Sequence, residues 1–237
     1  MKNSIKAGFC LSENVKSENG ETFVTEAVKC HKYDICQLLL IKGAKCDEEN
    51  SNSETPLMIA ATKNSKGFCK LLLKYGASID QTSSNQGYSA LIRAIQNDSA
   101  AETLPLVTFL VEQGADVNKR DVDGNTVLHH ALHCSKQILN FLISRGANVN
   151  VVNNKGWTPL MLAFCRFECQ PAFILAKAGA DFSLGIASPW IFANAQLIKY
   201  LHKRGFSIQS TTLKGKQSKS KPIENSDSSL KIDLNVS

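Results

Sequence analysis

The feature that most constrains this 237-residue chain is a pattern that returns about every 33 residues. A glycine ends an apolar run at six places, with successive intervals of 33, 38, 32, 33 and 26 residues: Gly43, Gly76, Gly114, Gly146, Gly179 and Gly205. A Thr or Ser that precedes an Ala by five residues keeps nearly the same period, at Thr22, Thr55, Ser89, Thr126, Thr158 and Ser188. Since two independent markers share one period, the chain is predicted to be built of stacked repeats.

Each marker has a physical reason that predicts two helices per repeat. A Thr hydroxyl can accept a backbone N–H at a helix N-cap, and a Pro in the first turn loses no hydrogen bond there, as at Thr55-Pro56 and Thr158-Pro159. The glycine suits the left-handed conformation that follows a helix. Bulky apolar pairs such as Leu71-Leu72 lie between these signals, where a second helix would face its neighbours. One repeat cannot bury such a face, so the repeats must stack.

The best-formed repeat runs from Gly114 to Gly146 and contains Thr126-Val127-Leu128-His129-His130-Ala131. This stretch resembles the T-P-L-H-x-A signature of the ankyrin repeat, whose period is about 33 residues. The resemblance implies an all-α solenoid of stacked helix-turn-helix units with short β-hairpin fingers. It covers residues 20–209, with repeats near 20–52, 53–85, 86–123, 124–155, 156–185 and 186–209. Residues 1–19 are then an N-terminal lead-in.

Two regions depart from the regular pattern. Ala94 and Gly114 are 20 residues apart, whereas Ala60 and Gly76 are 16 apart, so the third repeat carries four extra residues. We expect this insertion near residues 97–102, as a loop between the two helices. Residues 210–237 are rich in Ser and Lys and poor in aromatic residues, and a disordered tail is expected there.

Composition favours a chain kept in a reducing compartment. Its eight cysteines include no Cys-x-x-Cys pair, and Cys36 and Cys69 occupy the same position in successive repeats, as packing residues would. No apolar run approaches the length of a membrane helix, and the net charge of +6 forms no basic stripe with aromatic residues. We therefore expect a cytoplasmic or nuclear protein that binds neither membrane nor nucleic acid.

The stretch from His129 to Cys134 is the one place that suggests metal or nucleophile chemistry. On a regular helix His129 and His133 would share a face, as would His130 and Cys134. A zinc site needs at least three protein ligands, and no further pair stands at a recognisable spacing. Helix neighbours such as Cys134 and His130 rarely make a catalytic pair, and no phosphate-binding loop or nucleophile elbow is present. The prediction is a chain with no catalytic residues, metal or cofactor.

Ankyrin-like solenoids in general bind other proteins, so the resemblance implies a non-enzymatic interaction scaffold or adaptor. We expect a monomer whose partner is another protein rather than a small molecule. The fold alone does not select the partner. Three alternatives remain: a substrate-recruiting adaptor of a ubiquitin ligase, a bacterial effector that binds a host protein, and a metal-dependent enzyme.

The resemblance also implies which residues meet the partner. In ankyrin-like proteins the finger tips and first helices line one concave surface, where the residue before the T-P-L-H motif and the end of the first helix vary most. The corresponding residues are Tyr88, Asn125 and Trp157 in one row, Gln96, His133, Cys134 and Arg166 in a second row, and Arg120 on a finger. Tyr88, Trp157 and Arg166 are predicted to matter most, because aromatic and arginine side chains dominate interface hot spots. Alternatively, the two rings cover neighbouring fingers and Arg166 is a solvated helix end.

Two asparagines at the start of the fingers resemble substrates of asparaginyl hydroxylases. Asn118 follows Asp116-Val117 and has Leu110 eight residues before it, and Asn150 has Val149 and Leu142 in the matching places. The same context is also what a consensus ankyrin hairpin contains. Asn118 and Asn150 are therefore predicted hydroxylation sites.

Overall fold

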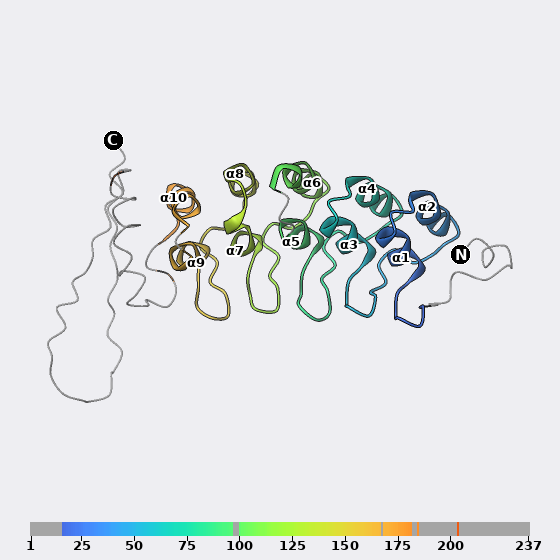
Figure 1. Cartoon of the computed structure of the whole chain (residues 1–237). Helices are drawn as coiled ribbons and strands as arrows, with labels where there is room; N and C mark the ends of the chain where they lie inside the picture. Colours follow the sequence, from blue (N-terminus) through green and yellow to red (C-terminus); the bar gives the residue numbers. More distant parts are fainter. Residues whose placement is uncertain (1–15, 97–99, 167, 182–183, 185–202, 204–237) are drawn as a thin grey trace, which may run out of the picture. The chain divides into compact units, whose positions relative to one another are not determined.

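The computed structural model of the chain describes residues 16–96, 100–166, 168–181, 184 and 203 (Figure 1). The chain separates into two compact units, residues 1–148 and 149–237. In chain order the helices of the described part are α1 (Phe23–Lys29), α2 (Tyr33–Ile41), α3 (Pro56–Thr62), α4 (Lys66–Lys74), α5 (Ala90–Ile95), α6 (Ala100–Glu112), α7 (Val127–His130), the 3-10 helix η2 (Ala131–His133), α8 (Lys136–Ser144), α9 (Pro159–Cys165) and α10 (Cys169–Lys177).

The first unit contains four helix pairs that follow one another as the repeat pattern predicts. The first helices α1, α3, α5 and α7 form one layer, and the outer helices α2, α4, α6 and α8 form a second layer (Figure 1). The predicted N-caps are present, since the hydroxyl groups of Thr22, Thr55 and Ser89 each accept the backbone N–H three residues ahead at 3.0–3.4 Å. In the second unit Thr158 caps α9 in the same way, at 3.2 Å.

The alanine of each first helix lies where the helices of a repeat meet. Ala27, Ala60, Ala94, Ala131 and Ala163 are at most 1% exposed. A larger side chain there would push the helices apart, because protein interiors are close-packed. The core of the first unit continues with fully buried residues of both layers, such as Leu57, Leu72 and Leu110.

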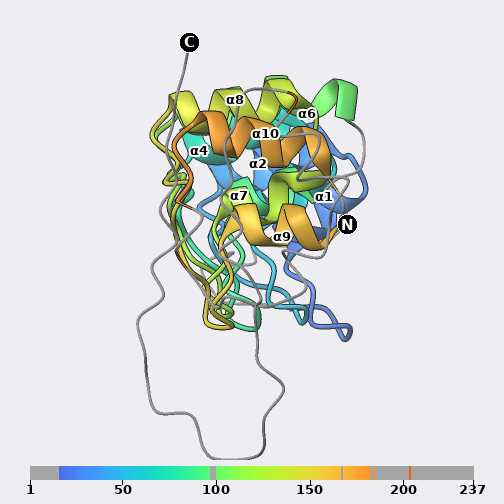
Figure 2. The ribbon, with the colours of Figure 1, turned by 90° about the vertical axis from the view of Figure 1, so that its left-hand side faces the viewer.

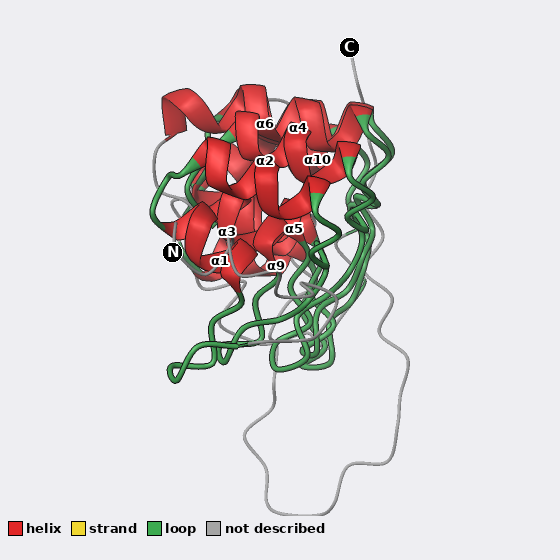
Figure 3. Cartoon of the chain, turned by 90° about the vertical axis from the view of Figure 1, so that its right-hand side faces the viewer, coloured by secondary structure: helices red, strands yellow, loops and turns green. Residues whose placement is uncertain are grey.

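The connections between repeats are long loops, here called fingers, that leave the helix layers on one side within each unit (Figures 1 and 2). Each begins at a glycine with φ between +85° and +96°, as the predicted left-handed position requires: Gly43, Gly76, Gly114, Gly146 and Gly179. The described fingers contain turns rather than strands (Figure 3). Over the residues that the structure describes, β-bridging is limited to Lys16 and Thr22, so the fingers lack the strand pairing of the predicted hairpins.

The prediction of a loop near residues 97–102 is wrong for residues 100–102, which are helical, while residues 97–99 lie outside the described residues. Helix α6 has 13 residues and begins at Ala100, whereas α2, α4, α8 and α10 have nine each. Residues 100–102 are Ala-Ala-Glu, all good helix formers, so this part of the insertion continues the helix towards its N-terminus.

The fourth repeat has one residue fewer than the second, and part of its first helix is a 3-10 helix. Ala131 and Gly146 are 15 residues apart, one fewer than Ala60 and Gly76. Helix α7 has four residues and continues as the 3-10 helix η2, which rises about 2.0 Å per residue instead of about 1.5 Å. Because of this larger rise, η2 covers the same distance along the helix axis with one residue fewer.

Buried thiols bear out the packing role expected for two of the cysteines. Cys36 and Cys69 lie in α2 and α4 and are fully buried. Burial raises the pKa of Cys36 to about 11 and that of Cys69 to about 12. At neutral pH both are protonated, and neither is reactive as a thiolate.

The second unit contains α9 and α10 of the fifth repeat. The predicted sixth repeat at 186–209 and the predicted tail at 210–237 lie outside the described residues, apart from Lys203. Residues 1–15 of the lead-in also lie outside them. None of the described helices has the length and apolar character that a membrane span needs.

Consecutive fingers are joined by a ladder of side chains at one repeat position, occupied by Asp47, Asp80, Asn118 and Asn150. Each side-chain oxygen accepts the backbone N–H of the residue two places after the next finger's glycine, at 2.7–3.0 Å: Ser78, Asp116, Asn148 and Asp181. The asparagines also donate from Nδ2 to the carbonyl of that glycine, Asn118 to Gly146 at 3.0 Å and Asn150 to Gly179 at 3.4 Å.

At the start of the first repeat, a glutamate side chain is hydrogen-bonded to α1 and to the first finger. Glu21 accepts hydrogen bonds from Lys29, from the Thr25 hydroxyl at 3.0 Å and from Asn50 at 3.2 Å. Burial by itself raises the pKa of Glu21, but the hydrogen bonds from Lys29, Asn50 and Thr25 outweigh it, and the pKa lies below its ordinary value. The charged carboxylate therefore ties α1 to the first finger.

We expect Glu21→Gln to lower the free energy of unfolding at pH 7 by about 1–2 kcal/mol. A carboxyl group whose pKa is lowered by folding stabilises the protein above its unfolded pKa of about 4.3, and the effect is lost as the pH falls through the folded value. Thermal unfolding of both proteins at pH 7, 5 and 3 should therefore show a difference that is smaller at pH 3 than at pH 7. Glu18→Gln, at an exposed glutamate of the same turn, is the control. An equal difference at all three pH values would contradict the assignment.

From the ladder we predict that two substitutions of Asn118 lower the stability of the fold by different amounts. Asn118→Asp keeps the acceptor for the Asn148 N–H, as Asp80 does one repeat earlier, but loses the donor to Gly146. Asn118→Ala loses both. We expect costs of about 0.5 kcal/mol for Asp and about 1 kcal/mol for Ala, measured by urea unfolding at neutral pH. Equal costs would show that the acceptor contributes nothing to stability.

Candidate protein-interaction surface

Each described finger ends in the same hydrogen-bonded turn, which fixes the residue that precedes the first helix. Asn50, Ser83, Asp121 and Asn153 are between 2% and 8% exposed, and the side-chain oxygen of each accepts the backbone N–H of that residue at 2.8–3.0 Å. In return their own N–H groups donate to its carbonyl at 2.9–3.0 Å. The residues held in this way are Glu54, Tyr88, Asn125 and Trp157.

The turns therefore give Tyr88, Asn125 and Trp157 equivalent places in their repeats, as the sequence predicted for this row. Tyr88 and Asn125 belong to the first unit and Trp157 to the second. All three side chains are half-buried. Glu54 holds the same place in the second repeat. Sequence reasoning missed it, although its position directly before Thr55-Pro56 is the signal that identified the other three.

Tyr88 lies at the centre of a group of side chains from three repeats of the first unit. The guanidinium carbon of Arg93, on α5, is 5.0 Å from the centre of the Tyr88 ring. The His130 ring, on α7, meets the same ring edge to face at 5.5 Å. Arg93 also pairs with Glu54 at 3.1 Å. We call Glu54, Tyr88, Arg93, Asp121 and His130 the Tyr88 cluster.

The electrostatics of the Tyr88 cluster hold its two basic side chains in place. Nε2 of His130 is 2.8 Å from the Asp121 carboxylate, which also accepts from Nδ2 of Asn125 at 3.2 Å. The side chains of Arg93 and His130 are 18% and 16% exposed, so an edge of each reaches the surface. Nε of Arg93 is buried without a hydrogen-bond partner among the described residues. A cation held against an aromatic ring is suited to meet the carboxylates and carbonyl groups of another protein.

The histidines of the fourth repeat do not have the geometry on which a metal site would depend. Helix α7 ends at His130, and Cys134 follows η2 in an extended conformation, so His130 and Cys134 do not share a regular helical face. Nδ1 of His129 accepts the Thr126 N–H at 3.0 Å inside the repeat. Within the described part of the chain, no three His, Cys, Asp or Glu side chains come together as metal ligands could.

The second predicted row lies at the ends of the first helices. Gln96 follows α5, His133 ends η2, and Arg166 follows α9; His133 and Arg166 are exposed and Gln96 is half-buried. The thiol of Cys134 faces inwards and lies 3.7 Å from the carbonyl oxygen of Ile95. Arg120 is exposed on its finger. Among the predicted contact residues, the thiol of Cys134 and the amide of Asn125 both make contacts inside the fold.

Sequence reasoning also missed Arg93 as part of this surface. Arg93 is the fourth residue of a six-residue helix and carries no motif of its own, and only the fold places it against Tyr88 and Glu54. His130 was considered as a metal ligand, whereas the structure gives it a carboxylate and an aromatic ring as neighbours.

Comparison with curated proteins gives matches over single stretches of the chain. An intracellular phospholipase A2 of Caenorhabditis elegans is 38% identical over 85 residues, which are 33% of this chain and 8% of that protein. A putative ankyrin repeat protein of Acanthamoeba polyphaga mimivirus is 40% identical over 63 residues, 26% of this chain and 9% of that protein. One of Rickettsia felis is 33% identical over 82 residues, 34% of this chain and 22% of that protein. The chain thus spans less than a quarter of each relative.

A family model describes much more of the chain. The model of ankyrin repeats in three copies matches residues 24–121 and again residues 99–185. Together the two matches cover the five helix pairs of the described structure. Ankyrin repeats are protein–protein interaction modules, and the family is in general not enzymatic. The all-α architecture, the repeat caps and this match agree, and the chain belongs to the ankyrin repeat family.

Proposed function

We propose that this chain is a non-enzymatic adaptor that binds another protein through the surface formed by its fingers and first helices. The observation that carries the proposal is the Tyr88 cluster. It brings the guanidinium of Arg93 and the imidazole of His130 against the ring of Tyr88, which the sequence predicts as a partner contact. Aromatic and arginine side chains supply much of the binding energy at protein interfaces.

The cluster is suited to binding because its side chains are ordered before a partner arrives. Arg93 is held by the Tyr88 ring and by Glu54, and His130 is held by the Tyr88 ring and by Asp121. Side chains that are already fixed lose less conformational entropy on binding, which favours affinity. In the second unit, Trp157 takes the position equivalent to Tyr88 and the exposed Arg166 follows α9, so we propose both as further contacts.

Two of the alternatives raised by the sequence would use the same binding surface and differ from this proposal in the kind of protein that they bind. A ubiquitin-ligase adaptor would use the same surface for its substrate, and a bacterial effector would use it for a host protein. The relatives named above come from an animal, a virus and a bacterium, and their similarity is confined to short stretches. The metal-dependent enzyme is the alternative with the least support, since the expected helical pairing of its ligands is not met.

The test compares variants of the full chain in affinity purification from cell extract, followed by direct binding measurements with the purified partner. We expect Tyr88→Ala, Trp157→Ala and Arg166→Ala each to weaken binding about tenfold or more, a loss of about 1.4 kcal/mol, with thermal stability nearly unchanged. Leu72→Ala removes a fully buried side chain and should instead cost about 2–5 kcal/mol of stability. Wild-type affinity in a folded Tyr88/Trp157/Arg166 triple-alanine variant would show that the partner uses another surface.

We also propose that Asn118 and Asn150 are hydroxylated by an asparaginyl hydroxylase. Asn118 is exposed and Asn150 is half-buried, and each side chain bonds to the neighbouring finger. Incubation with such an enzyme and its cosubstrates should add the mass of one oxygen atom per modified asparagine. The Asn118→Ala/Asn150→Ala variant should gain none. An unchanged intact mass of the wild-type chain would remove the proposal.

A further inference from the structure

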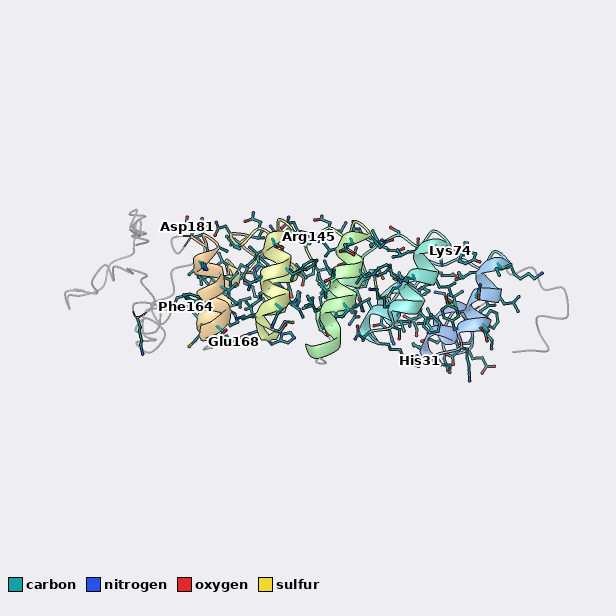
Figure 4. The ribbon with its side chains drawn as sticks, turned by 90° about the horizontal axis from the view of Figure 1, so that it is seen from above. His31, Lys74, Arg145, Phe164, Glu168 and Asp181 are labelled. Atoms are coloured by element: carbon teal, nitrogen blue, oxygen red, sulfur yellow. The ribbon has the colours of Figure 1, made fainter. Side chains whose placement is uncertain are left out.

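Helix α4 differs from the other outer helices of the first unit in its outward residues. Lys66, Lys70 and Lys74 follow one another at intervals of four residues, so they lie on one face of the helix, about 6 Å apart along its axis. All three are exposed, and α4 contains no acidic residue (Figure 4, where Lys74 is labelled). We call Lys66, Lys70 and Lys74 the α4 lysine face.

The neighbouring helix α6 gathers two of these lysines around one ring. Nζ of Lys66 is 5.3 Å from the centre of the Phe109 ring, and Nζ of Lys70 is 5.8 Å from it. Phe109 is 9% exposed, so its ring is fixed in the core, and both lysine nitrogens lie over the ring. The cation–π contacts hold two positive charges near each other in spite of their repulsion. An anion placed between them would relieve that repulsion.

The α4 lysine face has no internal counter-charge. Other positive charges of the unit are paired, Arg93 with Glu54 and Arg145 with Glu112. Among the described residues, no carboxylate lies within ion-pair distance of Lys66, Lys70 or Lys74. Two acids of the adjoining finger are occupied elsewhere: Asp47 accepts the Ser78 N–H, and Glu49 accepts the N–H and hydroxyl of Ser84. The face therefore keeps its full positive potential for an external anion.

We propose that the α4 lysine face is a second interaction surface, which binds an acidic helix of a partner protein. Carboxylates repeated every fourth residue on a helix have the same spacing of about 6 Å as the three lysines, so one short acidic helix can meet them all. The inference does not depend on the Tyr88 cluster, because it uses outer helices and a different set of charges.

An acidic protein segment fits this face better than nucleic acid or a membrane. Tight binding to duplex DNA requires contacts to several phosphates along a groove. The positions equivalent to Lys70 and Lys74 are Thr108 and Glu112 on α6 and Asn140 and Ser144 on α8, and Lys136 of α8 is the one further lysine in the row. Anionic membranes attract clusters of about four to eight basic residues. Three lysines on one helix match a partner of similar length.

The test uses the full chain and a fluorescent helical peptide with Glu at every fourth position on an Ala/Gln background. We expect saturable binding at physiological salt, weakened at least tenfold by Lys66→Gln/Lys70→Gln/Lys74→Gln and restored to within threefold of wild type by the corresponding triple Arg variant. The control variant removes the same charge from three exposed lysines elsewhere, Lys45, Lys136 and Lys155. It should bind within twofold of the wild type.

Each remaining outcome overturns the proposal. Equal losses in the α4 and control variants would mean that only net charge attracts the peptide. No binding by the wild-type chain at physiological salt would mean that the face is merely solvated. Tighter, lysine-dependent binding to duplex DNA or to vesicles containing phosphatidylserine would assign the face to another class of partner. Circular dichroism of every variant checks that the repeats remain folded.

Discussion

The hydrogen bond that passes from each finger to the next is the interaction on which the arrangement of the repeats depends. Helix packing alone leaves stacked repeats free to slide, because apolar contacts are not directional. The ladder of Asp47, Asp80 and Asn118 removes this freedom in the first unit, since each oxygen accepts one particular N–H of the following repeat. The buried turn residues, such as Asp121, then fix where each first helix begins. The positions of Tyr88 and His130 follow from these bonds.

Most of the repeat fold could be predicted because its signals are local. A hydroxyl at an N-cap, a glycine at a left-handed position and an alanine between helices each act within a few residues. The two departures depended on the balance between neighbouring elements. The extra residues before Leu104 extend α6 because they favour helix, and the missing residue after Ala131 is made up by a 3-10 turn. A count of residues shows that the spacing has changed, and it does not show which element absorbs the change.

The sequence predicts where the candidate site lies, but not which side chains contact one another in it. The rule that the residue before the helix cap faces outwards identified Tyr88 and also applies to Glu54. The contacts of Arg93 and His130 could not be predicted, because they join residues from three repeats and depend on how far each helix is rotated about its axis. The mistaken alignment of His130 with Cys134 has the same origin. It assumed a regular helix, whereas the chain has a single short turn followed by η2.

The charges of the first unit divide into those that build the fold and those that remain for a partner. Asp47, Glu49 and Asp121 are committed to backbone N–H groups, and salt screens the buried carboxylate of Asp121 least. The lysines of α4 have no such partner and lie in the outer helix layer, while the Tyr88 cluster lies on fingers and first helices of the same unit. Two proteins bound at these two places would be held at a fixed separation by the packed helix layers of this unit. Joining them would raise their effective concentration for each other without any new contact, which is the physical advantage of an adaptor.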